Sequence, residues 1–146
     1  MTTSLSIIDV VKAIATRYPA AIKEIGDEAI IVNRDSLFEV AAFLRDSDEF
    51  AFDYLNYLTA VDYYDYFEII YRITSLKHNH TLVLKTRCDR ENPSIPSVVR
   101  LWKGADFQER EAYDLLGIIF EEHPNLKRIF LWEGFQGHPL RKDYLS

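Results

Sequence analysis

The stretch FEIIYRITSLKHNHTLVLKTRC, from Phe67 to Cys88, decides the fold. From Phe67 to Thr74 large apolar side chains occupy every second position, and a similar alternation returns from His80 to Cys88. A period of two is that of a half-buried β-strand. The polar segment between Lys77 and His80 has the composition of a turn, so we predict two antiparallel strands joined as a hairpin.

Three shorter segments upstream of the hairpin have their own patterns. Residues 7–18 carry apolar side chains at helical spacing after a capping Ser6, and Pro19 ends the pattern. Residues 29–32 form a short apolar run that is typical of a strand. Ser36 and Glu39 have the spacing of a capping box, which predicts a second helix. Its buried face would contain Leu37, Val40, Ala41 and Leu44.

Tyrosine is concentrated in the predicted sheet, where six of the nine tyrosines fall between Tyr54 and Tyr71. Aromatic residues favour strands, so we expect these rings to pack on a sheet face. A platform for stacking nucleic-acid bases is the alternative. The net charge of −6 argues against unaided nucleic-acid binding, which requires a basic surface.

Length and composition favour one globular domain. The chain has 146 residues, of which 48% are hydrophobic. No stretch approaches the roughly 20 apolar residues of a membrane-spanning helix, and the first eight residues do not resemble a signal peptide. The single Cys88 excludes an internal disulfide and an iron–sulfur cluster held by four thiolates. We therefore expect a cytoplasmic protein in which Cys88 is a small core residue.

The second half of the chain changes character after the prolines of residues 92–96. We predict a long helix from about Ser97 to Leu116, followed by a short strand and an extended tail over residues 118–146. Residues 1–117 and 118–146 would together form one domain. The expected fold class is α+β, with a small mixed or antiparallel sheet, packed helices and an extended C-terminal segment.

A carboxylate interrupts the apolar seam of the long helix. The seam consists of Val98, Trp102, Ala105, Ala112 and Leu116, and the position that completes its helical spacing is Glu109. Burial of an unpaired charge costs several kcal/mol, so we expect Glu109 to have a cationic or hydrogen-bonding partner. Arg110 and Asp114 are four residues apart on another face and could pair with each other.

The tail contains GHPLRKDY, from Gly137 to Tyr144. A segment with Arg141, Lys142 and Asp143 but little local structure must dock on its own domain, where the Glu-rich helix is the obvious acceptor, or on another chain. A solvated chain end is the alternative.

Other arrangements of the same residues are less favoured. His123, His138, Glu111 and Asp114 lack the spacing of known metal ligands, so we interpret both histidines as structural. Glu109 and Glu111 point about 200° apart on a helix and cannot flank one substrate. Glu109 alone could be a proton-active carboxylate, although a structural ion pair is favoured. We expect His78 and His80 to be solvated, and the chain has no Gly-rich loop for NADH.

The same residues resemble a known family. The segment from Trp102 to Ile129 and the GHPLRKDY motif are similar to the signature of the C-type (30 kDa-type) subunit of the proton-pumping NADH:quinone oxidoreductase, respiratory complex I. The same module occurs in related membrane-bound hydrogenases. The motif residues, all expected to be structural or interfacial, are Trp102, Glu109, Arg110, Glu111, Asp114, Gly117, His123, Pro124, Arg128, Gly137, His138, Pro139, Leu140, Arg141, Lys142 and Asp143. Leu145 departs from the family pattern, in which proline usually stands at this position.

The resemblance implies a structural subunit of the peripheral arm, beside the quinone-reducing core. It implies B-, D- and I-type partner subunits that carry the iron–sulfur clusters and bind quinone, with no cofactor, metal or catalytic residue on this chain. Location would be peripheral, on the cytoplasmic side of the cell membrane. The alternatives are the equivalent subunit of an energy-converting hydrogenase or ferredoxin-dependent quinone oxidoreductase, and, with less support, a free-standing hydrolase or anion-binding module.

Overall fold

The structure is a computed structural model that describes residues 3–4, 7–131 and 136–143. Its elements are β1 (Thr3–Ser4), α1 (Ile7–Arg17), β2 (Ile22–Ile25), β3 (Ala29–Val32), the 3₁₀ helix η1 (Arg34–Ser36), α2 (Leu37–Asp46), β4 (Tyr54–Asp62), β5 (Tyr66–Ser75), β6 (His80–Asp89), β7 (Ser94–Pro96), α3 (Ala105–Leu116) and β8 (Ile119–Glu121). The predicted start of the first helix at Ser6 lies outside the described residues.

The main sheet has the order β2-β3-β6-β5-β4, and β1 pairs with another part of β6. Strands β4, β5 and β6 are antiparallel neighbours, whereas β3 and β1 run parallel to β6. Ser75 lies opposite His80, which confirms the predicted hairpin. A separate small sheet pairs β7 with β8 in parallel. This mixed sheet with packed helices confirms the α+β class.

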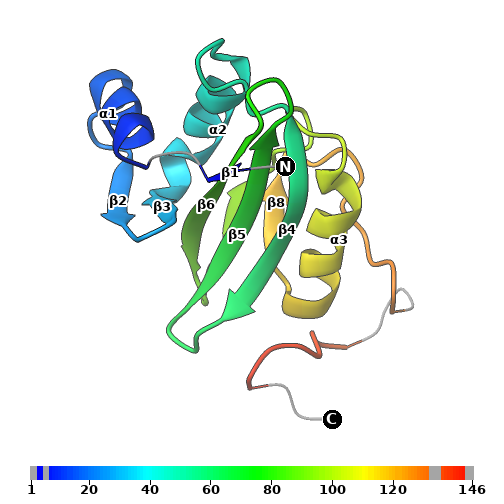
Figure 1. Ribbon diagram of the computed structural model, residues 1–146. Helices are drawn as coiled ribbons and strands as arrows, with labels where there is room; N and C mark the ends of the chain where they lie inside the picture. The colour runs from blue at the N-terminus through cyan, green and yellow to red at the C-terminus, as the bar shows by residue number, and fades with distance from the viewer. Residues whose placement is uncertain (1–2, 5–6, 132–135, 144–146) are drawn as a thin grey trace.

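One face of the main sheet forms the core. Leu58, Tyr71, Leu84 and Ile30 follow one another across β4, β5, β6 and β3 in register, and each is at most 4% exposed. Buried side chains of all three helices join the same hydrophobic cluster. Figure 1 shows α1 and α2 beside β2 and β3, and α3 beside β4. Among the described residues, no helix has the length and apolar character needed to cross a membrane.

Helix α2 confirms one prediction and corrects another. Leu37, Val40, Ala41 and Leu44 are fully buried, as the periodicity predicts. The predicted capping box is wrong, because the Ser36 side chain makes no capping hydrogen bond. Ser36 is the last residue of η1 and has φ −100° and ψ −5°, whereas a capping serine normally has extended backbone.

Helix α3 begins at Ala105, eight residues later than predicted. The chain folds back before it, so that the Glu109 carboxylate accepts the Val98 N–H at 2.9 Å. In a continuous helix these residues would be about 16 Å apart. Val98 and Trp102 are nevertheless buried, because a separate turn presents them to the core. The Trp102 ring donates to the Phe52 carbonyl at 3.0 Å.

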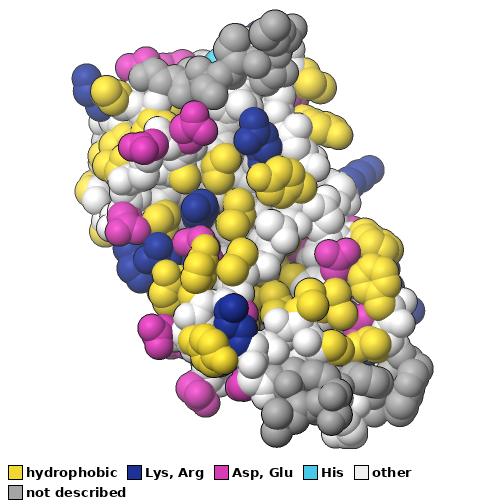
Figure 2. All heavy atoms as spheres, turned by 60° about the horizontal axis from the view of Figure 1, so that its bottom comes forward, with side chains coloured by type: hydrophobic (Ala, Val, Ile, Leu, Met, Phe, Trp, Pro, Cys, Tyr) yellow, Lys and Arg dark blue, Asp and Glu magenta, His cyan; other side chains and the backbone are white. Residues whose placement is uncertain are grey.

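The tyrosines are less buried than predicted. Tyr71 is fully buried in β5, but Tyr54, Tyr57, Tyr63 and Tyr64 are 40–60% exposed. The first two lie on β4, an edge strand of the sheet, and the others lie in the turn after it. Figure 2 brings the end of the molecule with this turn forward and shows hydrophobic side chains interspersed with charged ones.

Cys88 and the two hairpin histidines also have defined environments. Cys88 is 4% exposed and belongs to the core, as predicted, and burial raises the pKa of its thiol to about 11. His78 is exposed, but the prediction that His80 is solvated is wrong. The His80 ring is half-buried against Phe52, and this burial lowers its pKa.

Candidate functional site

At the C-terminal end of α3, the helical part of the sequence motif meets its C-terminal part. The last carbonyls of a helix lack partners within the helix. Gly117 N–H binds the Tyr113 carbonyl at 2.8 Å. The C-terminal segment supplies two further donors, because Leu140 N–H binds the carbonyl of Leu115 at 2.9 Å and Arg141 Nε that of Leu116 at 2.6 Å.

Asp114 holds the segment after β8 against this helix end. Its side chain is fully buried, and Oδ2 accepts the N–H groups of Ile129, Phe130 and Leu131 at 2.7–3.1 Å. Arg128 Nε donates to Oδ1. Burial opposes ionisation, but the guanidinium and the three N–H donors together hold the pKa of Asp114 below its usual value.

Arg128 connects three segments of the chain. Besides the Asp114 carboxylate, its guanidinium donates to the Asp114 carbonyl at 2.7 Å and to the Gly137 carbonyl at 2.6 Å. His138 Nδ1 lies 2.9 Å from the same Asp114 carbonyl. The predicted pairing of Asp114 with Arg110 is wrong, because Asp114 points inward, whereas Arg110 contacts the Lys127 carbonyl at 3.4 Å.

The remainder of the C-terminal segment reaches β4. Lys142 N–H binds Asp62 Oδ2 at 2.8 Å, and Arg90 pairs with both Asp62 and, at 3.0 Å, Asp143. Residues 136–143 are therefore docked on their own domain, and the alternative of a solvated end is wrong for them. On α3 the segment binds backbone carbonyls and not the glutamate side chains that were predicted to accept it. Glu111 of this helix is exposed. Figure 1 shows this segment below the end of α3.

Glu109 lies two helical turns before the C-terminal end of α3 and is fully buried. Its carboxylate accepts the Ser97 hydroxyl at 2.6 Å and the Val98 N–H at 2.9 Å, which confirms the predicted hydrogen-bonding partner. His123 Nε2 lies 3.9 Å from Oε1. Burial outweighs these hydrogen bonds and raises the pKa of Glu109 to about 7.

The His123 side chain is completely buried beside Glu109. Its Nδ1 accepts the Asn125 N–H at 2.9 Å, so Nε2 carries the proton of the neutral ring and lies 3.0 Å from Asp106 Oδ1. His138 lies instead near Asp114, which is two helical turns from Asp106, so the two histidines do not share one site. In the described part of the chain, no three His, Cys, Asp or Glu side chains group as metal ligands.

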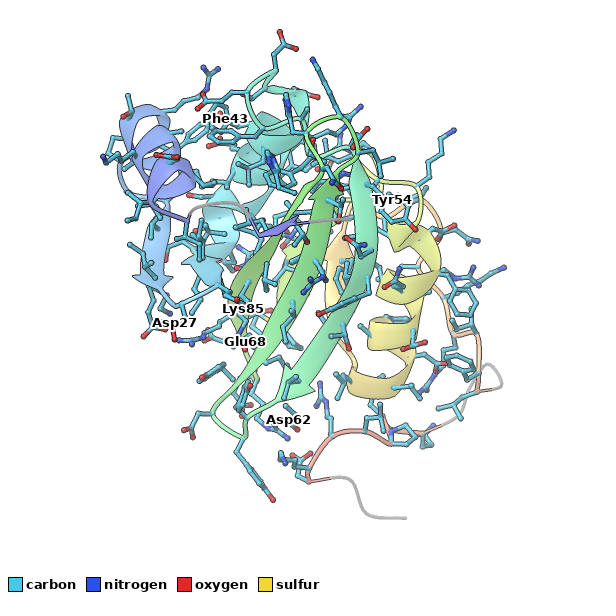
Figure 3. The ribbon with its side chains drawn as sticks, in the orientation of Figure 1. Asp27, Phe43, Tyr54, Asp62, Glu68 and Lys85 are labelled. Carbon is cyan, nitrogen blue, oxygen red and sulfur yellow. The ribbon has the colours of Figure 1, made fainter. Side chains whose placement is uncertain are left out.

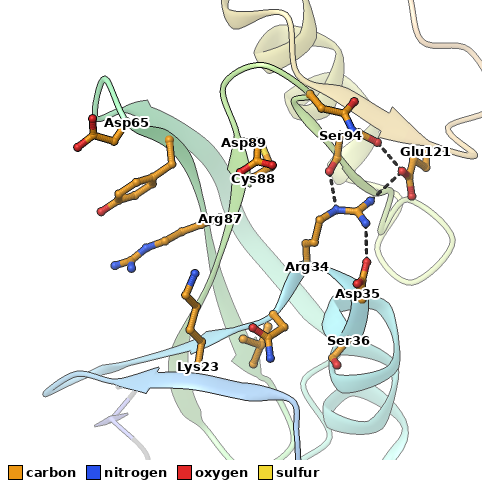
Figure 4. A pocket seen from close by; sticks show the side chains of 14 residues that line it. Lys23, Arg34, Asp35, Ser36, Asp65, Arg87, Cys88, Asp89, Ser94 and Glu121 are labelled. Carbon is orange, nitrogen blue, oxygen red and sulfur yellow. Dashed lines mark hydrogen bonds and ion pairs between the residues drawn. The ribbon is translucent and has the colours of Figure 1, made fainter.

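A hollow elsewhere on the described surface contains none of the motif residues. It has a volume of about 650 Å³ between the end of β3, η1, the end of β6 and the small sheet. Figure 4 shows Arg34 at its wall, bound to the Ser94 carbonyl at 2.7 Å and to Glu121 at 2.8 Å. A second carboxylate, that of Asp35, neutralises the same guanidinium. Arg34 thus joins η1 to the small sheet.

Several residues of these networks were not predicted. Asp62, Arg90, Ser97 and Arg34 have ordinary sequence contexts, and their long-range partners lie from 12 residues away, for Ser97 and Glu109, to 87 residues away, for Arg34 and Glu121. Only Asp62 had a sequence signal, since it closes the segment LTAVD that resembles the family.

The raised pKa of Glu109 predicts a pH-dependent stability. The folded chain holds this proton more tightly than the unfolded chain, whose Glu pKa is 4.5. The stabilisation is fully present below pH 4.5 and is lost as pH rises through about 7. Over this window the loss is about 3 kcal/mol. We expect Glu109→Gln to reduce this decline, measured by urea unfolding at pH 5 and pH 8.

The matched control is Glu111→Gln, which changes an exposed carboxylate on the same helix. It should retain the wild-type pH dependence. Identical pH profiles for Glu109→Gln and wild type would contradict the assignment of this decline to Glu109.

Gly117 has a conformational and a steric requirement for glycine. Its φ of 80° is left-handed, and a Cβ there would lie 2.8 Å from the His138 ring and 2.9 Å from the Arg141 guanidinium. We expect Gly117→Ala to lower the free energy of unfolding by about 1–3 kcal/mol. Gly104→Ala is the control, because Gly104 has φ −62° and open space around it. Equal unfolding midpoints in urea for the two variants would refute the steric argument.

Comparison with known proteins identifies the family. A family model described as respiratory-chain NADH dehydrogenase, 30 Kd subunit, matches residues 30–146. The C-type subunit of the NADH-quinone oxidoreductase of Roseiflexus sp. (strain RS-1) is 44% identical over 81% of this chain and 70% of that protein. The equivalent NADH-quinone oxidoreductase subunit of Chloroherpeton thalassium is 43% identical over 78% of this chain and 48% of that protein.

Two solved structures share the fold. A trypsin-resistant fragment (1–134) of Nqo5 is 27% identical, with a TM-score of 0.67 over 83% of this chain and 100% of the fragment. A chain of the membrane-bound sulfane sulfur reductase, an archaeal respiratory membrane complex, has a TM-score of 0.76 over 94% of this chain and 84% of its own length. At 23% identity that chain shows the fold alone. The chain thus belongs to the family of the 30 kDa subunit of the respiratory-chain NADH dehydrogenase, which is the C-type subunit of NADH-quinone oxidoreductases.

Proposed function

We propose that this chain is a structural subunit of the peripheral arm of a proton-translocating NADH:quinone oxidoreductase and has no redox centre of its own. It holds its position beside the quinone-reducing core through B-, D- and I-type subunits, on the cytoplasmic side of the membrane. The partner subunits carry the iron–sulfur clusters and bind quinone. The family membership and the internal use of the motif carboxylates support this function.

The two buried motif carboxylates, Asp114 and Glu109, bind groups of the chain itself, which is the observation that carries the proposal. Asp114 binds three N–H groups after β8, and Glu109 binds Ser97 and Val98 before α3. Glu109 and the neighbouring His123 side chain are both 0% exposed, so a substrate cannot contact either of them. These bonds stabilise a shape instead of activating a reactant, which disfavours the hydrolase alternative.

The experiment is purification of the full chain from its native membrane in mild detergent. The proposal expects it to elute with B-, D- and I-type subunits and with the absorbance of iron–sulfur clusters. NADH-dependent quinone reduction by that complex would distinguish it from the ferredoxin-dependent alternative. A lone monomer with hydrolytic activity would overturn the proposal, and so would a lone monomer without it.

The C-terminal segment supplies a test of the docking role. Arg141 caps α3 through its side chain and lies 5.2 Å from the Phe67 ring, whereas Lys142 binds Asp62 through its backbone. We expect Arg141→Ala with Lys142→Ala to reduce assembled complex several-fold. The domain should stay folded, because one hydrogen bond and the contacts of the two cations with the Phe67 and Tyr64 rings together amount to about 1–3 kcal/mol.

Lys142→Ala alone is the matched control, since it retains the backbone bond to Asp62. It should assemble more completely than the double variant. Assembly is measured by native gel electrophoresis of detergent extracts, and folding by circular dichroism. Wild-type assembly of the double variant would contradict the docking role.

A further inference from the structure

The face of the main sheet opposite the core has an unusual composition. Residues that lie opposite one another on neighbouring strands form three rows across this face, and we call these residues the open face. The first row is Tyr57, Arg72, Val83 and Ala29. The second is Thr59, Ile70, Lys85, Ile31 and Glu24, and the third is Val61, Glu68 and Arg87. The helices join the core on the other side, and no described helix packs here. An antiparallel sheet face in water is normally polar, whereas Val61, Ile70 and Val83 on this face are aliphatic and half-buried.

Most charges on the open face are paired within the chain. Glu68 binds Arg87 at 3.1 Å and Lys85 at 3.8 Å, and Glu24 binds Arg87 at 3.2 Å. Figure 3 shows Glu68 and Lys85 close together in the middle of the sheet. These three ion pairs use both acidic side chains of the face.

Arg72 is left over. It is half-buried between Tyr57 on β4 and Val83 on β6, and it has no hydrogen bond, ion pair or ring contact with any described residue. A guanidinium that is partly removed from water among apolar neighbours is destabilised unless an anion pairs with it. The face thus carries three basic and two acidic side chains, with the surplus positive charge in the row of Arg72.

We propose that the open face is an interaction surface for a different subunit, one that presents a carboxylate to Arg72 from within an apolar surface. A second copy of this chain does not fit, because its identical face would bring the same surplus positive charge toward Arg72. The aliphatic side chains supply the apolar centre of the contact, and the Arg72 ion pair sets its position. This inference rests on the proposed function and names the face through which the domain contacts a neighbouring subunit.

The test is assembly of the full chain in cells with Arg72→Glu. Reversal of this charge should lower the yield of assembled complex at least fivefold, whereas Arg72→Lys, which keeps the charge, should assemble. Lys12→Glu is the control, because it makes the same charge change at an exposed position of α1, a helix of the opposite layer. Equal melting temperatures of the purified variants exclude a folding defect, as expected for a side chain that has no bond with the residues the structure describes.

A photo-crosslinking residue at Thr59, exposed in the middle row, identifies the occupant. The inference expects a cross-link to one other subunit, in a peptide that contains Asp or Glu. Wild-type assembly of Arg72→Glu would overturn it, as would a cross-link to a second copy of this chain or no cross-link at all. If the wild-type chain itself does not purify with a complex, the proposed function fails first. If the wild type assembles and Arg72→Glu does too, only this inference fails.

Discussion

The buried carboxylate of Asp114 is the interaction on which the C-terminal half of the structure depends. Three consecutive backbone N–H groups and one guanidinium converge on it. The segment around Arg128 has no regular secondary structure, so these bonds replace the ladder that a strand would provide. Arg128 then carries the connection onward to the backbone of Gly137. Loss of either charged partner would leave the other as a buried charge with only neutral hydrogen-bonding partners.

Glu109 plays the corresponding part near the middle of the same helix. It fixes the turn at Ser97 and Val98 against α3. It has hydrogen-bond donors, but no Lys or Arg of the described residues pairs with it. Its carboxyl group is therefore easily protonated, whereas that of Asp114 is not. Burial raises the pKa of both acids, and the guanidinium and three N–H donors at Asp114 reverse this effect, whereas the two neutral donors at Glu109 do not.

The two sides of the molecule differ in how far their polar groups are satisfied. Around the end of α3, helix carbonyls, carboxylates and guanidinium groups pair with one another within the chain. On the open face, Arg72 lacks a partner among the described residues, although it lies among apolar neighbours. A rigid end and an incompletely satisfied sheet face together suit a subunit whose role is to hold others in place.

The sequence by itself determined the hairpin of β5 and β6, the buried face of α2, the place of Cys88 in the core and the burial of Glu109. Each follows from local periodicity, which acts between residues a few positions apart. The family signature likewise identified the residues around α3. Only the tertiary structure decided the partner of Asp114, the late start of α3, the exposure of Tyr57 and the docking of Lys142 on Asp62. These depend on contacts between residues from 11 to 80 positions apart, because the three-dimensional path of the chain, not its local period, brings those groups together.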